Sequence, residues 1–432
     1  MNRYGMGAIA LFATLAGSAL PAQDTATVRL TLNEAVERAL SNSPEIVRAT
    51  GAVTTSEWSE RTALGAFLPN LSASSGMGLN SSTRYNPQTQ TTVTGSGESY
   101  NAGLSLSYDL FTGGRRLAEL RRSRAGTASA EAAMLESRFS VILNTKTTFF
   151  NVQRQQELIR VAQGTVQRSQ EALEAAQRRL QVGSATRSDV LRAQLDLNNA
   201  RQALLNAQTQ HRTASYDLGV LVGVIGPVEV QVDSLAVPRP LPMTDDELVS
   251  SAITSAPAVV SAEAAVNTAE AGHSVAKAQY FPSLRASSGY DWSNQQATFN
   301  NGNQSWNLRF SLSYPLFNGF SRESQVANAD VQVRNALATL ATAKRQVGAD
   351  VQRVLGDLRL AEQQVSLATE ALGVAREDLR VNQERYRLGM ATILDLLLSQ
   401  NNMRSAESDV VGARYDYEIA RAQLEALVGR QL

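Results

Sequence analysis

The sequence predicts an α+β membrane protein built from two copies of one unit, each with two β-strands and a long antiparallel helical hairpin. Three observations support this fold class. Segments of about ten residues alternate apolar and polar side chains, as strands with two different faces do. Proline is absent from 88–226 and from 316–432, so each half can form very long helices. Similar blocks also recur in the same order in both halves, which indicates a duplication.

Composition excludes several classes of function. The 432 residues include 40 basic and 40 acidic side chains, so nothing favours nucleic acid as a partner. The chain has no cysteine and only two histidines, His211 and His273, which are far apart in the sequence. We therefore expect no thiol enzyme, no His/Cys metal site, no bound cofactor and no enzymatic activity.

Residues 1–22 are predicted to be a secretory signal peptide. Arg3 supplies a positive charge, an apolar stretch follows, and small residues stand at Ala19 and Ala22. The apolar stretch is short for a membrane span of about 20 residues, so cleavage near either alanine is favoured over an anchor. No other stretch looks long and apolar enough to span as a helix, so we expect the exported chain to enter a membrane only as strands.

Four ordered blocks define the two repeats, which we place at 23–225 and 244–432. LNEAVERALSNSPEI matches DELVSSAITSAPAVV, AFLPNLSASSG matches QYFPSLRASSG, and LSLSYDLFTGG matches FSLSYPLFNGF. The fourth pair is RRLQVGSATRSDVLRAQ and RYRLGMATILDLLLSQ, each with a glycine six residues before an aspartate. Between the repeats, 226–243 holds four of the 11 prolines and is expected to be an extended, equatorial linker.

Strands are expected at about 68–80, 99–111, 282–293 and 305–317. A soluble sandwich with one core face would alternate in the same way, so the pattern alone leaves that possibility open. The polar segments 80–99 and 293–305 suit solvated loops between paired strands, which favours a membrane hairpin. The aromatic residues toward the strand ends are expected at the membrane interface: Tyr100, Tyr108, Tyr290, Trp292, Trp306 and Tyr314.

Four strands cannot close a barrel by themselves. Spanning barrels have at least eight strands, and an open edge in lipid leaves backbone groups unpaired at a cost of several kcal/mol each. If these strands lie in a membrane, several chains must therefore share one barrel.

Long helices are expected at about 114–182 and 188–222, and again at about 319–388 and 392–428. At 1.5 Å per residue, the longer ones would each extend roughly 100 Å. Such helices bury too little apolar surface alone and must pack side by side. A simple dimeric coiled-coil rod is disfavoured, because the apolar positions are small and mixed rather than a strict Leu/Ile heptad.

On these features the whole mature chain resembles the TolC-type outer-membrane efflux proteins, also called outer-membrane factors. The shared features are the duplicated LSLSY-L-F-G junction and the Y-x-x-G-x-x-x-x-x-D motif at Tyr386, Gly389 and Asp395, with a degenerate copy ending at Asp189. The resemblance implies a homotrimer with a twelve-stranded barrel in outer-membrane lipid, continued by a twelve-helix α-barrel in the periplasm. It also implies a periplasmic adaptor (membrane fusion) protein and an inner-membrane transporter as partners, in efflux or type I secretion.

The two Gly-turn-Asp features are expected to be the helical turns. Gly183 and Gly389 can adopt positive φ and end the outgoing helices. Ser188 or Thr392 can cap the returning helices, with an aspartate near the positive end. The resemblance implies that these tips form the periplasmic entrance of a passive exit duct.

The resemblance assigns gate roles to individual residues. Tyr386 stands at the place of the gate tyrosine, Asp189 at that of its carboxylate partner, and Asp395 at that of an entrance-lining aspartate. A gate arginine is missing, because Ala391 occupies its place, and Leu398 replaces a second aspartate. Arg187 is our candidate substitute for the arginine.

We expect a resting entrance that is closed, with an Asp189–Tyr386 bond as one tie. A ring of three Asp395 carboxylates would favour cations. The alternative function is a barrel-anchored trimeric stalk or adhesin, for which the polar loops are short.

Overall fold

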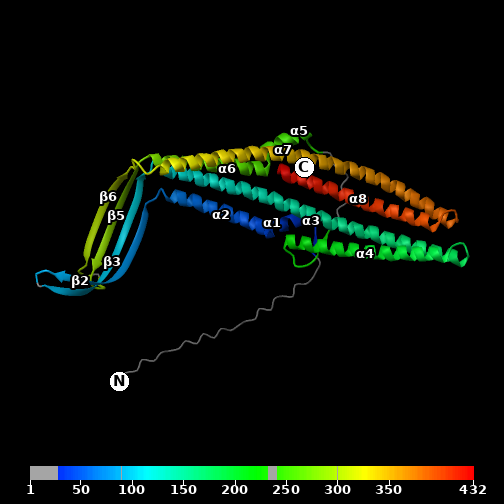
Figure 1. The fold of residues 1–432 in the computed structure, drawn as a ribbon, viewed down its shortest axis with the longest axis horizontal. Helices are drawn as coiled ribbons and strands as arrows, with labels where there is room; N and C mark the ends of the chain where they lie inside the picture. Colours follow the sequence, from blue (N-terminus) through cyan, green and yellow to red (C-terminus); the bar gives the residue numbers. More distant parts are fainter. Residues whose placement is uncertain (1–27, 89, 232–240, 299) are drawn as a thin grey trace, which may run out of the picture.

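The computed structural model describes residues 28–88, 90–231, 241–298 and 300–432. Figure 1 shows an elongated molecule, with a β-sheet at one end and long helices that run from it to two turns at the other end. The expected signal peptide and residues 232–240 of the expected linker lie outside the described residues.

The sheet has four antiparallel strands in the order β2-β3-β5-β6. The strands are β2 (Asn70–Asn86), β3 (Thr91–Phe111), β5 (Ser283–Asn294) and β6 (Asn303–Ser313). Their register places Leu104 opposite Tyr290, and Tyr290 opposite Trp306. Because side chains alternate between faces, the apolar residues of all four strands fall on one face of the sheet.

The expected loop at 80–99 is largely strand, which corrects the sequence prediction. β2 and β3 remain paired as far as Asn86 opposite Thr91. The segment was interpreted as a loop because both of its faces are polar. Its threonines, tyrosine and valine still favour extended backbone, so the paired strands continue through this polar segment. The second connection is short and lies between Asn294 and Asn303.

Two long hairpins form the other end of the molecule. They consist of α3 (Arg115–Gln181) with α4 (Arg187–Val222), and of α7 (Ser321–Arg387) with α8 (Ile393–Val428). The helices of each hairpin have 67 and 36 residues in both repeats, as a duplication requires. α3 packs along α4 and α8, and α8 packs along α7, so α4 and α7 are the edge helices of this four-helix layer.

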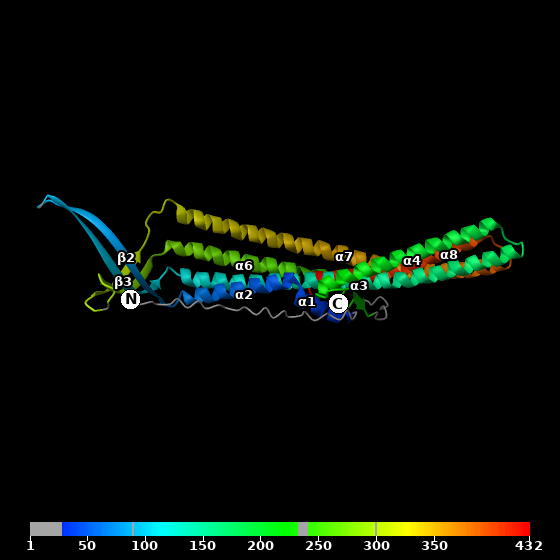
Figure 2. The ribbon, with the colours of Figure 1, turned by 90° about the horizontal axis from the view of Figure 1, so that it is seen from below.

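Each repeat also contains a pair of shorter helices that the sequence analysis did not assign. These are α1 (Leu32–Asn42) and α2 (Pro44–Gly65), and α5 (Asp245–Ser255) and α6 (Pro257–Lys277). Each proline is the first residue of the second helix, where its missing N–H costs nothing. Figure 2 shows α2 and α6 beside the sheet-proximal half of the long helices.

The segment Asp245–Tyr280 has the length and apolar composition of a membrane-spanning helix, contrary to the expectation that no such stretch remained. The segment is not one continuous helix, because Ala256 has extended backbone (ψ 140°) between α5 and α6. α6 packs against α3 and α7, and α5 packs against α7. We interpret the apolar composition as packing surface of the helical layer.

A short parallel pair links the two repeats at mid-height. β1 (Val28–Leu30) pairs with β4 (Val228–Val230), so part of the expected linker is a strand. Leu30, Val228 and Val230 are buried in one cluster with Phe149 of α3 and Leu218 of α4. A separate core at the helical tips holds the candidate site.

Candidate functional site

The two tips are built by the same backbone turn. Gly183 and Gly389 have φ of +74° and +80°, the left-handed conformation that glycine adopts without a Cβ penalty. In the first tip, Ser184 N–H donates to the Arg179 carbonyl (2.8 Å) and Gly183 N–H donates to the Leu180 carbonyl (3.0 Å).

The second tip repeats these bonds. Met390 N–H donates to the Arg385 carbonyl (2.8 Å), and Gly389 N–H donates to the Tyr386 carbonyl (3.1 Å). Both tips are therefore Schellman turns that satisfy the last carbonyls of the outgoing helix.

Thr186 and Thr392 cap the returning helices α4 and α8. Thr186 replaces the expected cap Ser188, because the helix starts two residues earlier than its polar pattern suggested. In each tip the threonine N–H donates to an aspartate carboxylate at 2.9 Å, and the aspartate N–H donates back to the threonine hydroxyl. This capping box holds the pKa of Asp189 and of Asp395 below its usual range, chiefly through the threonine backbone N–H.

Tyr386 is buried in the tip core, with only 4% of its surface exposed. The expected bond from its hydroxyl to Asp189 is not formed in this chain. The Asp189 carboxylate accepts from Thr186 instead, and the buried tyrosine hydroxyl makes no hydrogen bond within the described residues of this chain. Burial raises the pKa of Tyr386, so the hydroxyl stays protonated at neutral pH.

Arg179 is the residue that connects the two hairpins at the tip, and the sequence analysis missed it. Its guanidinium donates to the Tyr386 carbonyl (2.7 Å) and to the Ser184 carbonyl (3.1 Å). It also lies 4.6 Å from the centre of the Tyr386 ring. The available signal was its position four residues before Gly183, where a basic side chain faces the negative end of a helix.

Arg187 does not take this role in the single chain. It is the first residue of α4 and is exposed, and no ion pair of Arg187 is found within the described part of the chain. Arg192 is the cation nearest the Asp189 carboxylate, at 3.8 Å. Asp395 is also exposed and is positioned only by its capping box.

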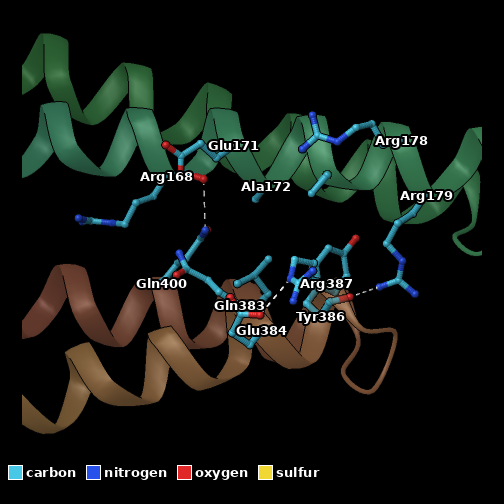
Figure 3. A pocket seen from close by; sticks show the side chains of 12 residues that line it. Arg168, Glu171, Ala172, Arg178, Arg179, Gln383, Glu384, Tyr386, Arg387 and Gln400 are labelled. Carbon is cyan, nitrogen blue, oxygen red and sulfur yellow. Dashed lines mark hydrogen bonds and ion pairs between the residues drawn. The ribbon is translucent and has the colours of Figure 1, made fainter.

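A cavity of about 390 Å³ lies between α3, α7 and α8 next to the arginine contact. Figure 3 shows Arg179 reaching toward Tyr386 at one end of this cavity and Gln400 bonded to the backbone of Arg168 at the other. Its wall carries charges of both signs, which include Arg168, Glu171 and the bonded pair Arg387 and Glu384. Across the ranges that the structure describes, no group of acidic or histidine side chains could hold a metal ion.

Among the described residues, three ion pairs along the seam between α3 and α8 have the cation on α3. From the sheet side toward the tip they are Lys146–Glu425 (2.5 Å), Arg154–Asp416 and Arg168–Glu407 (2.7 Å). Both side chains of the first and third pairs are at most 20% exposed. Removing one partner of such a pair leaves a poorly solvated charge, so these pairs hold the two hairpins of one chain together.

The sheet places five of the six predicted interface aromatics on its apolar face. The even-numbered residues of β3, β5 and β6 share that face, and they include Tyr100, Tyr108, Tyr290, Trp292 and Trp306. Tyr314 follows the last residue of β6. On the opposite face Arg285 donates to Asp109 at 2.6 Å.

Comparison with known proteins agrees with this architecture. The family model "Outer membrane efflux protein" matches residues 35–224 and 248–430. The chain is 28% identical to the protein CyaE of Bordetella pertussis over 409 residues, which cover 91% of this chain and 81% of CyaE. It is 25% identical to the pyoverdine export outer membrane protein OpmQ of Pseudomonas aeruginosa, over 92% of this chain and 83% of OpmQ.

Solved structures share the fold at lower identity. CusC superposes with a TM-score of 0.81 at 18% identity and covers 94% of this chain and 93% of its own. The open state of the MtrE channel of Neisseria gonorrhoeae superposes with a TM-score of 0.77 at 21% identity, covering 92% and 89%. The family match spans both repeats, and therefore this chain belongs to the outer membrane efflux protein family, whose members are channels of the bacterial outer membrane and not enzymes.

Proposed function

We propose that this protein is the outer-membrane exit duct of a tripartite efflux or type I secretion system. Three chains would each give four strands to one closed barrel and four long helices to one periplasmic tunnel. The observation that carries this proposal is the four-stranded sheet with one apolar face, whose outer strands β2 and β6 each pair on one side only. Closure with further copies removes edges that lipid would not tolerate.

The partners are an adaptor at the helical tips and a transporter in the inner membrane. This assignment is supported by the roles of the relatives, which include pyoverdine export for OpmQ and toluene efflux for TtgC of Pseudomonas putida. Those cargoes differ, while the outer-membrane component keeps one architecture. We therefore assign conduction to this chain and leave the choice of cargo to its partners.

The gate lies at the two tips. Arg179 links the end of α3 to the end of α7, and Asp395 lines the entrance from the start of α8. Three copies of Asp395 around a three-fold axis would form an acidic ring that favours cations. The capping box lowers the pKa of Asp395, so this ring stays charged at neutral pH and its cation preference would be lost only as pH falls through that lowered pKa.

Single-channel conductance in a planar bilayer tests the proposal. Purified protein should give small, stable, cation-favouring steps, and the preference should decline in acid. Asp395→Ala should weaken the preference, whereas Asp330→Ala, which removes an exposed carboxylate far from the tips, should not. A correctly folded trimer that gives no steps would support the barrel-anchored stalk or adhesin instead.

A further inference from the structure

We propose that the cavity between α3, α7 and α8 binds a small hydroxy acid, and that the bound molecule holds the two hairpins of a chain together near the tips. Binding depends only on the cavity. The effect on the tips rests on the proposed duct function, because it describes how the gate of that duct is regulated.

The cavity has the size and the lining of a small-molecule site. Its volume of about 390 Å³ falls within the range of about 300–1,000 Å³ that is common for ligand pockets. Ala172 and Leu396 give it an apolar wall, and both are almost fully buried. They lie on α3 and α8, the inner helices of the four-helix layer, so one chain supplies this wall.

Three polar atoms of the lining residues are buried and make no hydrogen bond within the described residues of this chain. They are Arg168 Nε, the side-chain oxygen of Gln400 and the Tyr386 hydroxyl. Gln400 and Tyr386 are only 5% and 4% exposed, so bulk water does not satisfy them. A buried polar group without a partner is costly, and a ligand that bonds these atoms regains that loss.

At the end of the cavity away from the tips, the free atoms select a hydroxyl group. Figure 3 shows Arg168 and Gln400 at this end. Gln400 Nε2 donates to the Arg168 carbonyl at 3.2 Å, which leaves the amide oxygen as an acceptor. The terminal nitrogens of Arg168 bond Glu407, which leaves its Nε–H as a donor. A hydroxyl can donate to the first and accept from the second, whereas a carbonyl or an ammonium group can do only one of these.

At the tip end, the side chains select an anion. Figure 3 shows Arg178 and Arg179 on α3 at this end, opposite Tyr386 of α7. Arg179 bonds only neutral carbonyls, and Arg178 has a long, exposed contact with Glu174 at 3.7 Å. Both cations can therefore bind a carboxylate, to which the Tyr386 hydroxyl can also donate.

The carboxylates already on the wall leave this preference in place. Four arginines and two glutamates line the cavity, so positive charge is in excess. Glu384 is paired with Arg387, and Glu171 accepts a hydrogen bond from Gln167. A small acid that also carries a hydroxyl group matches the charge at one end and the free atoms at the other.

A molecule bound in this cavity bridges the two hairpins. Arg168 and Arg178 belong to α3, whereas Tyr386 and Gln400 belong to α7 and α8. The tie that we assign to the gate, from Arg179 to the Tyr386 carbonyl, lies at the tip end of the same cavity. Separation of the tips would pull the walls apart and break the ligand's bonds to one hairpin. The ligand therefore stabilises the joined arrangement by mass action.

Calorimetric titration of the full-length protein in detergent tests the site, with 3-(4-hydroxyphenyl)propionate as the probe and a detergent blank. Two matched probes each lack one group: 3-phenylpropionate has no hydroxyl, and 3-(4-hydroxyphenyl)propionamide has no charge. Each should bind roughly tenfold more weakly than the full probe. Equal binding of all three would reveal apolar contact alone, and no binding would mean that water fills the cavity. Either result overturns the proposal.

Variants locate the two ends of the probe. Gln400→Leu should bind the full probe and 3-phenylpropionate equally, because the hydroxyl loses its acceptor. Arg178→Gln should weaken both carboxylate probes about threefold and leave the amide probe unchanged, whereas Arg201→Gln, at an exposed arginine outside the cavity, should change none. Ala175→Leu fills the cavity from a half-buried position and should weaken all three probes, which keeps a test should Gln400→Leu not fold. A folded Gln400→Leu protein that still prefers the full probe would contradict the site.

Single-channel records test the effect on the tips. At ten times its dissociation constant, the full probe on the tip side should make opening steps roughly tenfold rarer, and 3-phenylpropionate at the same concentration about twofold rarer. Gln400→Leu should remove this difference, which simple block of the pore would not. Specific binding with unchanged openings would overturn the regulatory role.

The site and the duct function can fail separately. A protein that binds the probe and never conducts would contradict the duct function while the site stands. A protein that conducts and binds no probe would contradict the site while the duct function stands.

Discussion

The two helical tips have nearly identical backbones and different side-chain roles. Each has the same pair of turn hydrogen bonds, a glycine with positive φ and a threonine–aspartate capping box. Three residues before the glycine, however, the first tip has Leu180, which is 39% exposed, and the second has Tyr386, which is 4% exposed. Only the second tip carries a residue that is buried beneath an arginine of the other hairpin.

The arginines four residues before each glycine differ in the same way. Arg179 bonds carbonyls of both tips, whereas Arg385 is exposed and its side chain makes no hydrogen bond within the described residues. Duplication kept the residues that the chain needs to reverse direction. Residues that reach across to the other hairpin were free to diverge, and the gate we propose depends on that divergence.

Substitution of the arginine four residues before each glycine is expected to give the largest difference between the two tips in conductance and hydrogen exchange. Arg179→Gln should remove two charge-assisted hydrogen bonds and a ring contact, at a cost of about 2–3 kcal/mol to the contact between the two tips. We expect larger conductance steps and faster hydrogen exchange of the amides at 383–390. Arg385→Gln, the matched change in the other tip, should leave both unchanged. Equal effects of the two variants would mean that neither arginine ties the hairpins.

The glycines should show no such asymmetry. Gly183→Ala and Gly389→Ala each force a side chain into the left-handed region, at about 1–2 kcal/mol. Neither added Cβ meets an atom closer than the 3.6 Å contact of Gly389 with Arg179, so the strain is that of the backbone alone. Thermal melting of the two variants should show similar losses, with Gly126→Ala as a helix-interior control. A much larger loss for one glycine would show that its turn has a role beyond reversing the chain.

The same contrast explains what the sequence could predict. Turn residues and strand alternation depend on a few neighbouring positions, so the glycines and the apolar sheet face could be recognised directly. Long helices followed from the absence of proline.

The Arg179–Tyr386 contact joins residues 207 positions apart, and no local pattern encodes it. The β2–β3 extension was missed for a different reason, because polarity on both faces is shared by loops and by solvated hairpins.

The capping threonines should have a smaller effect, again equal in the two tips. Thr186→Ala and Thr392→Ala should each cost about 1 kcal/mol, because the helix start loses its side-chain cap.

The aspartates add a pH dependence. Their pKa values are lowered in the folded protein, so their contribution is full above about pH 4 and is lost as pH falls through the folded pKa. Melting at pH 7 and at pH 3 should show the loss, and Asp189→Asn/Asp395→Asn should reduce it. A difference between pH 7 and pH 3 that the double variant leaves unchanged would place the acid-sensitive groups elsewhere.

The smallest effect on conductance and stability is expected from a change at Tyr386, the tyrosine of the Y-x-x-G-x-x-x-x-x-D motif. Tyr386→Phe removes a hydroxyl that makes no hydrogen bond within the described residues of one chain, while the ring under Arg179 and the carbonyl that Arg179 bonds remain. Conductance should therefore be unchanged, and stability should be unchanged or slightly higher, because a buried unpaired polar group is lost. Leu180→Phe is the matched change in the first tip and should also be neutral. If Tyr386→Phe alone opened the channel, the hydroxyl would have to bond a neighbouring chain in the trimer, and the tie to a carboxylate such as Asp189 would form between chains.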